Sequence, residues 1–176
     1  MMLDRYCRQS GAERRCEMRE DGRFDAFCEM MEELDRGAYL MDEYDSLLHD
    51  YNGVVMFQAE SQMIKAIGDS PGITAARLAK KFGKSAGACS QLIRKLKSKE
   101  WVSQVRNREN SREYNLILTE AGKDIYIKHR DFEEACYERT FRMLDEVSRT
   151  EMETYARIQR LLNKAFEIDV AESKEI

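Results

Sequence analysis

The sequence predicts a mainly α-helical protein with one small β-hairpin, and three observations support this fold class. A single proline and nine glycines among 176 residues leave long stretches free to be helical. Apolar residues recur at three- and four-residue steps along most of the chain, which is the period of an amphipathic helix. Between residues 101 and 118 the pattern instead indicates two short strands with a polar turn between them.

Composition excludes several classes of protein. A chain that is 43% hydrophobic and 35% charged is typical of a globular protein and not of a disordered one. No apolar run of about 18 residues is present, and the first residues are charged where a signal peptide needs an apolar core, so we expect a cytoplasmic protein without a membrane span. The five scattered cysteines include no CxxC pair, and no Cys/His spacing or catalytic constellation stands out. We therefore expect thiols, no metal or other cofactor, and no enzymatic activity.

Positive charge is concentrated in one segment of this acidic chain. The whole protein has a net charge of −4, yet residues 77–112 contain 11 of the 29 Lys and Arg residues and only two of the 33 Asp and Glu residues. That segment carries +9, and the rest of the chain carries −13. Charge separation of this size favours a polyanionic partner, since a basic surface attracts phosphates.

The first half of the chain predicts an extension and two helices. Residues 1–22 are polar and weakly patterned. A long amphipathic helix is expected from Phe24 to Tyr51, where Asn52-Gly53 would break it. A second helix is expected from Met56 to Ile67, followed by the turn GDSPG at 68–72.

Two short helices joined by a glycine-containing turn come next. The first is expected from the N-cap Thr74 to Phe82, and the second over Ala86–Lys99, with Ser85 as its N-cap. The second helix has an apolar face made of Cys89, Leu92, Ile93 and Leu96, and its opposite face is small and polar. This combination is typical of a helix-turn-helix.

A β-hairpin and two helices complete the predicted order. The strands are expected at 101–106 and 113–118, with Asn and Ser turn formers and basic flanks at the tip between them, so the hairpin forms a wing. Thr119 is expected to cap a helix that runs to about Glu146. The capping box at 148–151 opens a last helix that runs through Phe166.

From about residue 24 to residue 166 this order resembles the MarR-type (multiple antibiotic resistance regulator) winged helix-turn-helix family. The family's wing pattern is Asp-x-Arg-x-x-x-Leu-x-Leu-Thr-x-x-Gly, and residues 110–122 read NSREYNLILTEAG. The first position departs from the pattern, because Asn110 replaces Asp. Glu100 is a second departure, since the family usually has Gly at the end of the recognition helix. A positive φ at Glu100 would cost about 1–2 kcal/mol, and a helix end shifted by one residue would avoid that cost.

The resemblance implies a homodimer that binds double-stranded DNA through one lobe in each subunit. Residues 56–118 would form the winged helix-turn-helix lobe, 23–55 and 119–168 the helical dimerisation region, and 169–176 a tail. The resemblance also implies a repressor of nearby genes that binds an inverted repeat. A small phenolic or lipophilic effector, or an oxidant, would release it.

The residues expected to contact DNA follow from the helix-turn-helix and the wing. Small residues at the front of the second helix allow close approach to base edges, and Gln91 and Arg94 can make bidentate base contacts. Lysines near the turn would hold phosphates, and the wing arginines would reach the minor groove or the phosphates. The alternatives are a plain solvated face, and arginines that only protect a strand edge. The candidates are Thr74, Lys80, Lys84, Ser85, Gly87, Ser90, Gln91, Arg94, Lys95, Arg108 and Arg112.

Two routes of regulation stay open at this stage. An effector pocket would involve Tyr44, Leu48, Met56 and Met63, although a Met and aromatic stripe also suits a dimer core. Cys28 would instead sense peroxide, as in one branch of the family, or be a small buried apolar residue. Acids flank it in sequence, which disfavours a reactive thiolate. A further alternative is a winged helix that binds an acidic protein without reading DNA sequence.

Overall fold

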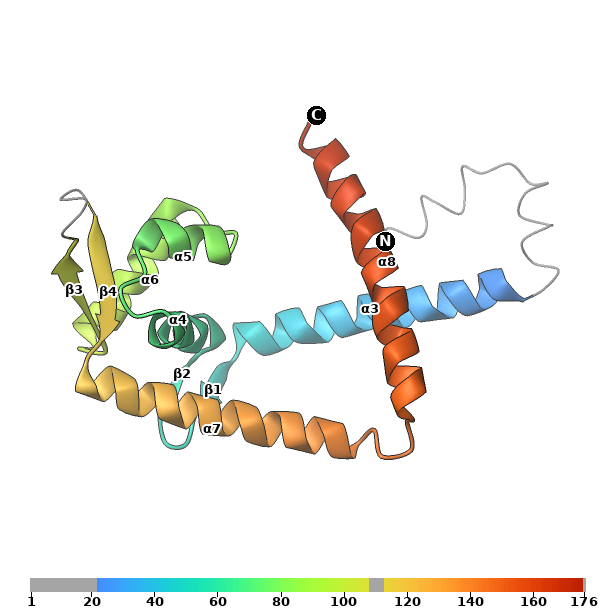
Figure 1. The fold of residues 1–176 in the computed structure, drawn as a ribbon, viewed down its shortest axis with the longest axis horizontal. Coiled ribbons are helices and arrows are strands. Elements are labelled where there is room, and N and C mark those ends of the chain that lie inside the picture. Colours follow the sequence, from blue (N-terminus) through green and yellow to red (C-terminus); the bar gives the residue numbers. More distant parts are fainter. Residues whose placement is uncertain (1–21, 108–112, 176) are drawn as a thin grey trace.

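The computed structural model describes residues 22–107 and 113–175, and it has the predicted mainly helical architecture. A lobe of three helices and a hairpin lies at one end of the molecule, and three long helices extend from it or turn away from it (Figure 1). Two small antiparallel hairpins are present in the described residues, not one. None of the described helices is both long and apolar enough to cross a bilayer.

Helix α3 (Arg23–Ser46) is shorter than the sequence predicts, and a β-hairpin follows it. Strand β1 (Leu48–Asp50) pairs antiparallel with β2 (Val55–Phe57), so the prediction of helix as far as Tyr51 is wrong. The turn between the strands has positive φ at Asn52 (54°) and Gly53 (90°). Both residues tolerate the left-handed region better than most, which explains a tight turn at this place.

Tyr51 shows why the chain leaves the helix here. Its side chain is only 1% exposed, and its hydroxyl donates a hydrogen bond to the side-chain oxygen of Gln58. The Ser61 hydroxyl donates in turn to the Tyr51 oxygen at 3.1 Å. The hairpin therefore brings Tyr51 into the core of the lobe with its polar end satisfied.

Helix α4 (Gln58–Asp69) is the central element of the lobe. It begins two residues later than predicted, because Met56 belongs to strand β2. Gly68 lies so close to the Tyr126 ring that an added Cβ would be 2.4 Å from it. This close approach lets α4 pack directly on helix α7 (Glu120–Arg142), which follows the wing.

The helix-turn-helix forms as the sequence predicts. Helix α5 (Ala75–Lys81) is capped by Thr74, whose side chain accepts from the Arg77 N–H, and α6 (Ala86–Ser98) is capped by Ser85, which accepts from the Ala88 N–H. The Cys89 side chain is buried and donates to the Ala75 carbonyl at 3.5 Å. The turn between the helices has Gly83 at φ 59°.

The wing consists of β3 (Val102–Arg106) and β4 (Tyr114–Leu118), paired antiparallel as predicted. Leu116 joins it to the lobe, since its carbonyl accepts from the Gly72 N–H at 2.8 Å and its N–H donates to the Ile73 carbonyl at 3.0 Å. Leu116 itself is fully buried. The first Leu of the family's wing pattern thus has a packing role.

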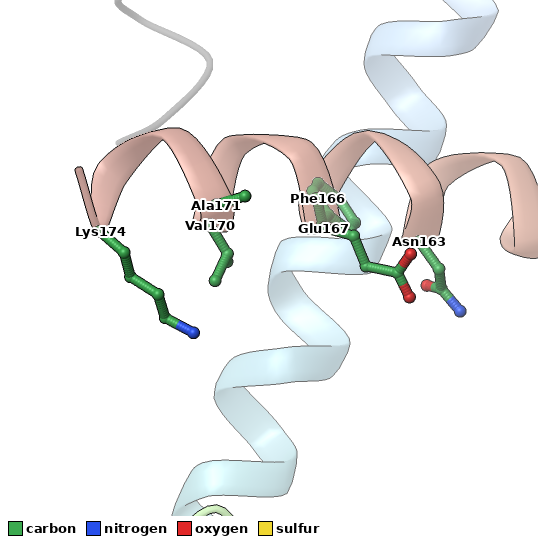
Figure 2. A pocket seen from close by; sticks show the side chains of 6 residues that line it. All are labelled: Asn163, Phe166, Glu167, Val170, Ala171 and Lys174. Atoms are coloured by element: carbon green, nitrogen blue, oxygen red, sulfur yellow. The ribbon is translucent and has the colours of Figure 1, made fainter.

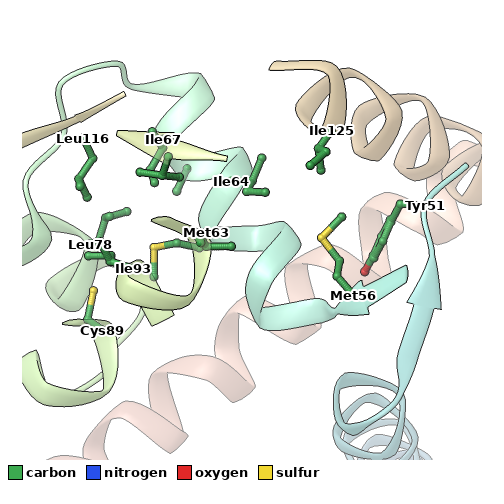
Figure 3. Close-up of a cluster of buried hydrophobic side chains, with 13 residues drawn as sticks. Tyr51, Met56, Met63, Ile64, Ile67, Leu78, Cys89, Ile93, Leu116 and Ile125 are labelled. Carbon is green, nitrogen blue, oxygen red and sulfur yellow. The ribbon is translucent and has the colours of Figure 1, made fainter. Parts of the chain in front are cut away.

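One hydrophobic core holds the lobe together (Figure 3). Leu78, Cys89 and Ile93 from the helix-turn-helix gather near Met63 of α4, and Tyr51 lies beside Met56 at the other end of the cluster. Ile125 from α7 also belongs to it. The core therefore joins α6, α4 and the start of α7 into one packed unit.

The last two helices bury little of their surface within one chain. Helix α7 (Glu120–Arg142) ends before the predicted Glu146, and α8 (Arg149–Ser173) continues past the predicted Phe166, so 169–173 is helix and not tail. The capping box at Ser148 and Glu151 forms as predicted. No residue of α3 or α8 is buried.

Candidate nucleic-acid interface

The outward face of α6 is exposed, and the side chains at the N-terminal end of that face are small. A Cβ added at Gly87 would meet only the Ser85 hydroxyl oxygen, at 4.0 Å, and Ser90, Gln91 and Arg94 are exposed on the same helix. Within residues 22–107 and 113–175, the Arg94 side chain has no acidic partner, so its guanidinium is available to a ligand. A guanidinium and an amide on a helix with a narrow front suit bidentate contacts to base edges in a major groove.

Exposed cations surround the front of that helix. Lys80 and Lys81 end α5, and Lys84 lies in the turn before Ser85. None of the three forms an ion pair with another described residue. Unpaired ammonium groups beside a helix N-terminus suit phosphate oxygens, which fix the position of a protein on DNA without reading sequence.

Thr74 is buried, which leaves little of its side chain to contact a phosphate. Its side chain is 9% exposed and caps α5 through the Arg77 N–H at 3.4 Å. Its backbone lies opposite Asn115 of the wing. The structure therefore gives Thr74 a role in building the helix-turn-helix.

The lysines at the end of α6 and directly after it pair with other side chains of the same chain. Lys95 Nζ lies 3.2 Å from Glu60 Oε2, and Lys99 Nζ lies 2.6 Å from Glu60 Oε1. Lys97 donates to the Gln104 side chain of the wing at 2.6 Å. Lys95, which the sequence places among the DNA contacts, is thus ion-paired with a buried carboxylate.

The tip of the wing lies outside the described residues. Arg108 and Arg112, the two predicted wing contacts, belong to that tip, as does Asn110. The described strands reach it on both sides, with Arg106 and Tyr114 exposed at their ends. Contacts by the two arginines stay predictions.

Glu100 adopts the conformation that the family's glycine suits. Its φ is 60°, so the idea of a shifted helix end is wrong. The Thr119 hydroxyl donates to the Glu100 carbonyl at 2.6 Å, and the Thr119 side chain also caps α7 through the Gly122 N–H at 3.0 Å. Two residues of the wing pattern therefore hold the strained junction after α6.

The four expected pocket residues lie in two different environments. Met56 and Met63 are 1% exposed within the core, whereas Tyr44 and Leu48 are exposed at the end of α3 and in β1. Two shallow depressions lie elsewhere, on α7 and on α8, and contain none of the four. The Tyr44 ring lies 3.9 Å from the His49 ring.

The cysteines of the described residues are thiols in three settings. Cys28 and Cys136 are half-buried on α3 and α7, and Cys89 is buried in the lobe. Burial raises the pKa of the Cys89 thiol, which keeps it protonated and unreactive. No three His, Cys, Asp or Glu side chains in the described part of the chain come together as a metal site.

A buried histidine at the joint between α7 and the β1–β2 hairpin is absent from the sequence predictions. His129 is 2% exposed, and its ring lies 5.1 Å from that of Tyr51. Its Nδ1 has no hydrogen-bond partner among the described residues. Burial lowers the pKa of His129 below its ordinary value. Its place in the three- and four-residue pattern after Ile125 is the signal that could have marked it as buried.

Comparison with known proteins agrees with this geometry. Residues 58–113, which span α4 to the wing, match the model of the MarR family. No curated protein matches the chain. FabT of Streptococcus pneumoniae, solved in complex with DNA, is 19% identical with a TM-score of 0.60, over 82% of this chain and 97% of that one.

Two further solved structures are similar over most of their length. ZitR of Lactococcus lactis, a zinc-responsive MarR family member, is 16% identical with a TM-score of 0.66, over 80% of this chain and 99% of that one. The adhesin competence repressor AdcR of Streptococcus pyogenes is 18% identical with a TM-score of 0.59, over 80% of this chain and 98% of that one. At these identities the likeness shows the fold.

Proposed function

We propose that this chain, whose residues 58–113 match the MarR family model, is a winged helix-turn-helix regulator of that type and a sequence-specific transcriptional repressor. It binds an inverted-repeat operator as a homodimer and releases it when a small effector binds. The MarR family consists of DNA-binding transcription regulators. What carries the proposal in this chain is Arg94, an exposed guanidinium without an acidic partner in the described residues, on a helix whose front is narrow.

The charge distribution supports DNA as the partner. Unpaired lysines at the end of α5 and in the following turn lie next to the face that carries Arg94. Phosphate contacts from such lysines supply affinity for any sequence, and base contacts from Gln91 and Arg94 add preference for one. The lobe thus offers both kinds of contact on one side.

Uncovered apolar faces support the homodimer. Large apolar side chains are exposed along α3, the second half of α7 and α8, including Met41 (71%), Tyr137 (70%) and Leu161 (57%). Figure 2 shows one such face of α8, where Phe166 and Val170 border a shallow depression. Apolar faces of this extent mark an interaction surface, and a second copy of the same helices would cover them symmetrically.

Release by a small ligand is the favoured mode of regulation. A ligand acts only by preferring one spacing of the two recognition helices. Tyr44 is exposed near the end of α3 and Leu48 is exposed in strand β1, whereas Met56 of strand β2 is buried in the core of the lobe. An apolar or phenolic effector at this place would contact both the α3 region and the lobe.

The experiment that tests the function selects bound duplexes from a random DNA pool. We expect an inverted repeat whose half-site centres are about one helical turn, roughly 34–36 Å, apart. The rival function is a winged helix that binds an acidic protein. Binding to random duplex DNA separates the two, because log K for a DNA binder falls with log salt by about 0.9 for each phosphate contact. A flat salt dependence together with no enriched sequence would support the rival.

A further inference from the structure

A buried carboxylate connects the recognition helix to the hairpin that follows α3. Glu60 is 2% exposed near the start of α4. One of its oxygens accepts from the Phe57 N–H at 3.2 Å and from Lys95 at 3.2 Å, and the other accepts from Lys99 at 2.6 Å. The carboxylate therefore has three partners, one in strand β2 and two on or just after helix α6.

Ring contacts strengthen the same connection. Lys95 Nζ lies 5.1 Å from the centre of the Phe57 ring, and Lys99 Nζ lies 4.4 Å from the centre of the Trp101 ring. Cation–π contacts of this kind stabilise an ammonium over an aromatic face. Phe57 ends β2 and Trp101 precedes β3, so both hairpins touch the lysines that Glu60 holds.

The carboxylate is charged in the folded protein. Burial by itself raises the pKa of Glu60, but hydrogen bonds from Lys99, the Phe57 N–H and Lys95 lower it below its ordinary value. A buried charge with several hydrogen bonds fixes the geometry of its partners, because moving any of them leaves the charge unpaired. The two lysines are less buried than Glu60, since the Lys95 side chain is 47% exposed and the Lys99 side chain is 31% exposed.

The held lysines lie on the same ridge as a base-reading candidate. Gln91, Lys95 and Lys99 are spaced four residues apart on or just after α6, so they follow one face of the helix. Gln91 is exposed at the front, and the two lysines behind it bend toward Glu60. Freed from that carboxylate, their long side chains would add two mobile positive charges beside the DNA-facing surface.

We infer that Glu60 is a positioning residue that sets the DNA selectivity of the protein. It fixes α6 relative to the β1–β2 hairpin, and it keeps Lys95 and Lys99 from binding phosphates of any sequence. The inference rests on the proposed DNA-binding function. Base contacts need a fixed helix, whereas phosphate contacts need only charge. Both effects of Glu60 therefore raise the ratio of operator affinity to random-DNA affinity.

The test compares the native protein with Glu60→Gln on a selected operator and on a scrambled duplex over a range of salt concentrations. We expect operator affinity to fall about tenfold or more, while random-DNA affinity holds or rises. The salt slope on random DNA should steepen by up to about 0.9 for each freed lysine. Equal losses on both duplexes with an unchanged slope would reduce Glu60 to a general structural role and overturn the inference.

Glu133→Gln is the matched control. It changes net charge equally and removes the ion pair between Glu133 of α7 and Lys65 of α4, but it leaves α6 untouched. Its operator-to-random ratio should stay within about twofold of the native value. The same loss of ratio in Glu133→Gln would show that any broken pair has this effect, against the inference.

Lys95→Met gives an independent test if Glu60→Gln folds poorly. The substitution keeps the apolar stem and leaves Lys99 to pair with Glu60. Operator affinity should fall several-fold while the random-DNA salt slope stays native, in contrast to Lys84→Met, which should lose about 0.9 of slope. A slope loss in Lys95→Met would show that Lys95 binds phosphate, which overturns the inference. If the native protein itself prefers no sequence, the proposed function fails; if it does and Glu60→Gln keeps the full ratio, only this inference fails.

Discussion

Side chains on α6 and in the turn before it are expected to divide between reading bases and holding phosphates, and mutation can measure this division. Arg94 is exposed without an acidic partner in the described part of the chain, and Lys84 lies in the turn before the helix. Arg94→Ala should weaken binding to selected sites by about 1–3 kcal/mol and relax base preference, because a bidentate contact to a base is lost. Lys84→Ala should weaken all sequences alike. Equal losses on operator and random DNA for Arg94→Ala would assign Arg94 to the phosphates.

Glu100 offers a prediction about stability. With φ at 60°, the backbone of Glu100 is strained because its Cβ lies close to the following carbonyl oxygen. A glycine would remove that strain, and the extra freedom that it gives the unfolded chain costs less than the strain. Glu100→Gly should therefore raise the free energy of unfolding by about 0.5–1 kcal/mol in urea denaturation. Glu100→Ala removes the same carboxylate but keeps the strain, so it should show no such gain. A gain in both variants would point to the charge instead.

Cys28 separates ligand control from redox control. It is half-buried on α3, and Asp25 and Glu29 lie nearby in sequence, where acids disfavour a thiolate. We expect Cys28→Ser to keep its response to the natural inducer. DNA release by peroxide, measured for the native protein and the variant, decides the matter. Release of native protein but not of Cys28→Ser would favour the redox sensor.

At the scale of elements, local signals were enough for most helices. Thr74, Ser85, Thr119 and Ser148 each cap the helix that the sequence assigns to them, because a cap depends on residues within three positions. The β1–β2 hairpin escaped prediction for the opposite reason. Leu48 and Tyr51 continue the apolar period of α3, and each strand is only three residues long. Only the burial of Tyr51 against α4 favours the hairpin over a continued helix.

The candidate interface was predictable to the same extent. The exposed face of α6 follows from its helical period, whereas the partner of Lys95 does not. Glu60 lies 35 residues away from Lys95 in the sequence, and nothing near either residue indicates their pairing. Long-range pairs of this kind depend on the packing of α4 against α6, which no local pattern encodes.

The joint between α7 and the hairpin predicts a pH dependence. The pKa of His129 is lowered by burial, while Glu133 and Asp69 oppose that shift and Lys65 adds to it. The unfolded chain therefore binds a proton more readily, so the free energy of unfolding should fall as pH drops below about 6.5, the ordinary value for His. Above that pH the contribution of His129 is constant.

Urea denaturation at pH 7.5 and pH 5.5 measures this effect against His129→Leu. Carboxylates titrate in both proteins, so the difference between their pH dependences isolates the histidine. The native protein should lose more stability than the variant on acidification. Equal losses would show that His129 is readily protonated in place.

The whole molecule predicts an obligate homodimer. Neither α3 nor α8 buries a residue within one chain, and a lone subunit would expose both apolar faces to water. Light scattering at micromolar concentration should give twice the mass of the 20.6 kDa chain. Tyr155→Glu on α8, which puts a charge on a 63% exposed aromatic position, should favour dissociation if that side chain lies in the interface. A monomeric mass for the native protein would overturn the prediction.

The contact between Gly122 and Trp101 has a mechanical consequence. A Cβ at Gly122 would lie 1.9 Å from the Trp101 carbonyl oxygen, so the start of α7 rests directly on the backbone that leaves α6. A joint packed backbone to backbone has no compressible side chain to absorb motion. Helix α7 has 23 residues and is thus roughly 34 Å long. Because its first turn is packed rigidly on the lobe, a tilt of the helix is transmitted to the lobe. A displacement of about 3 Å at its far end turns the winged helix-turn-helix lobe through about 5°.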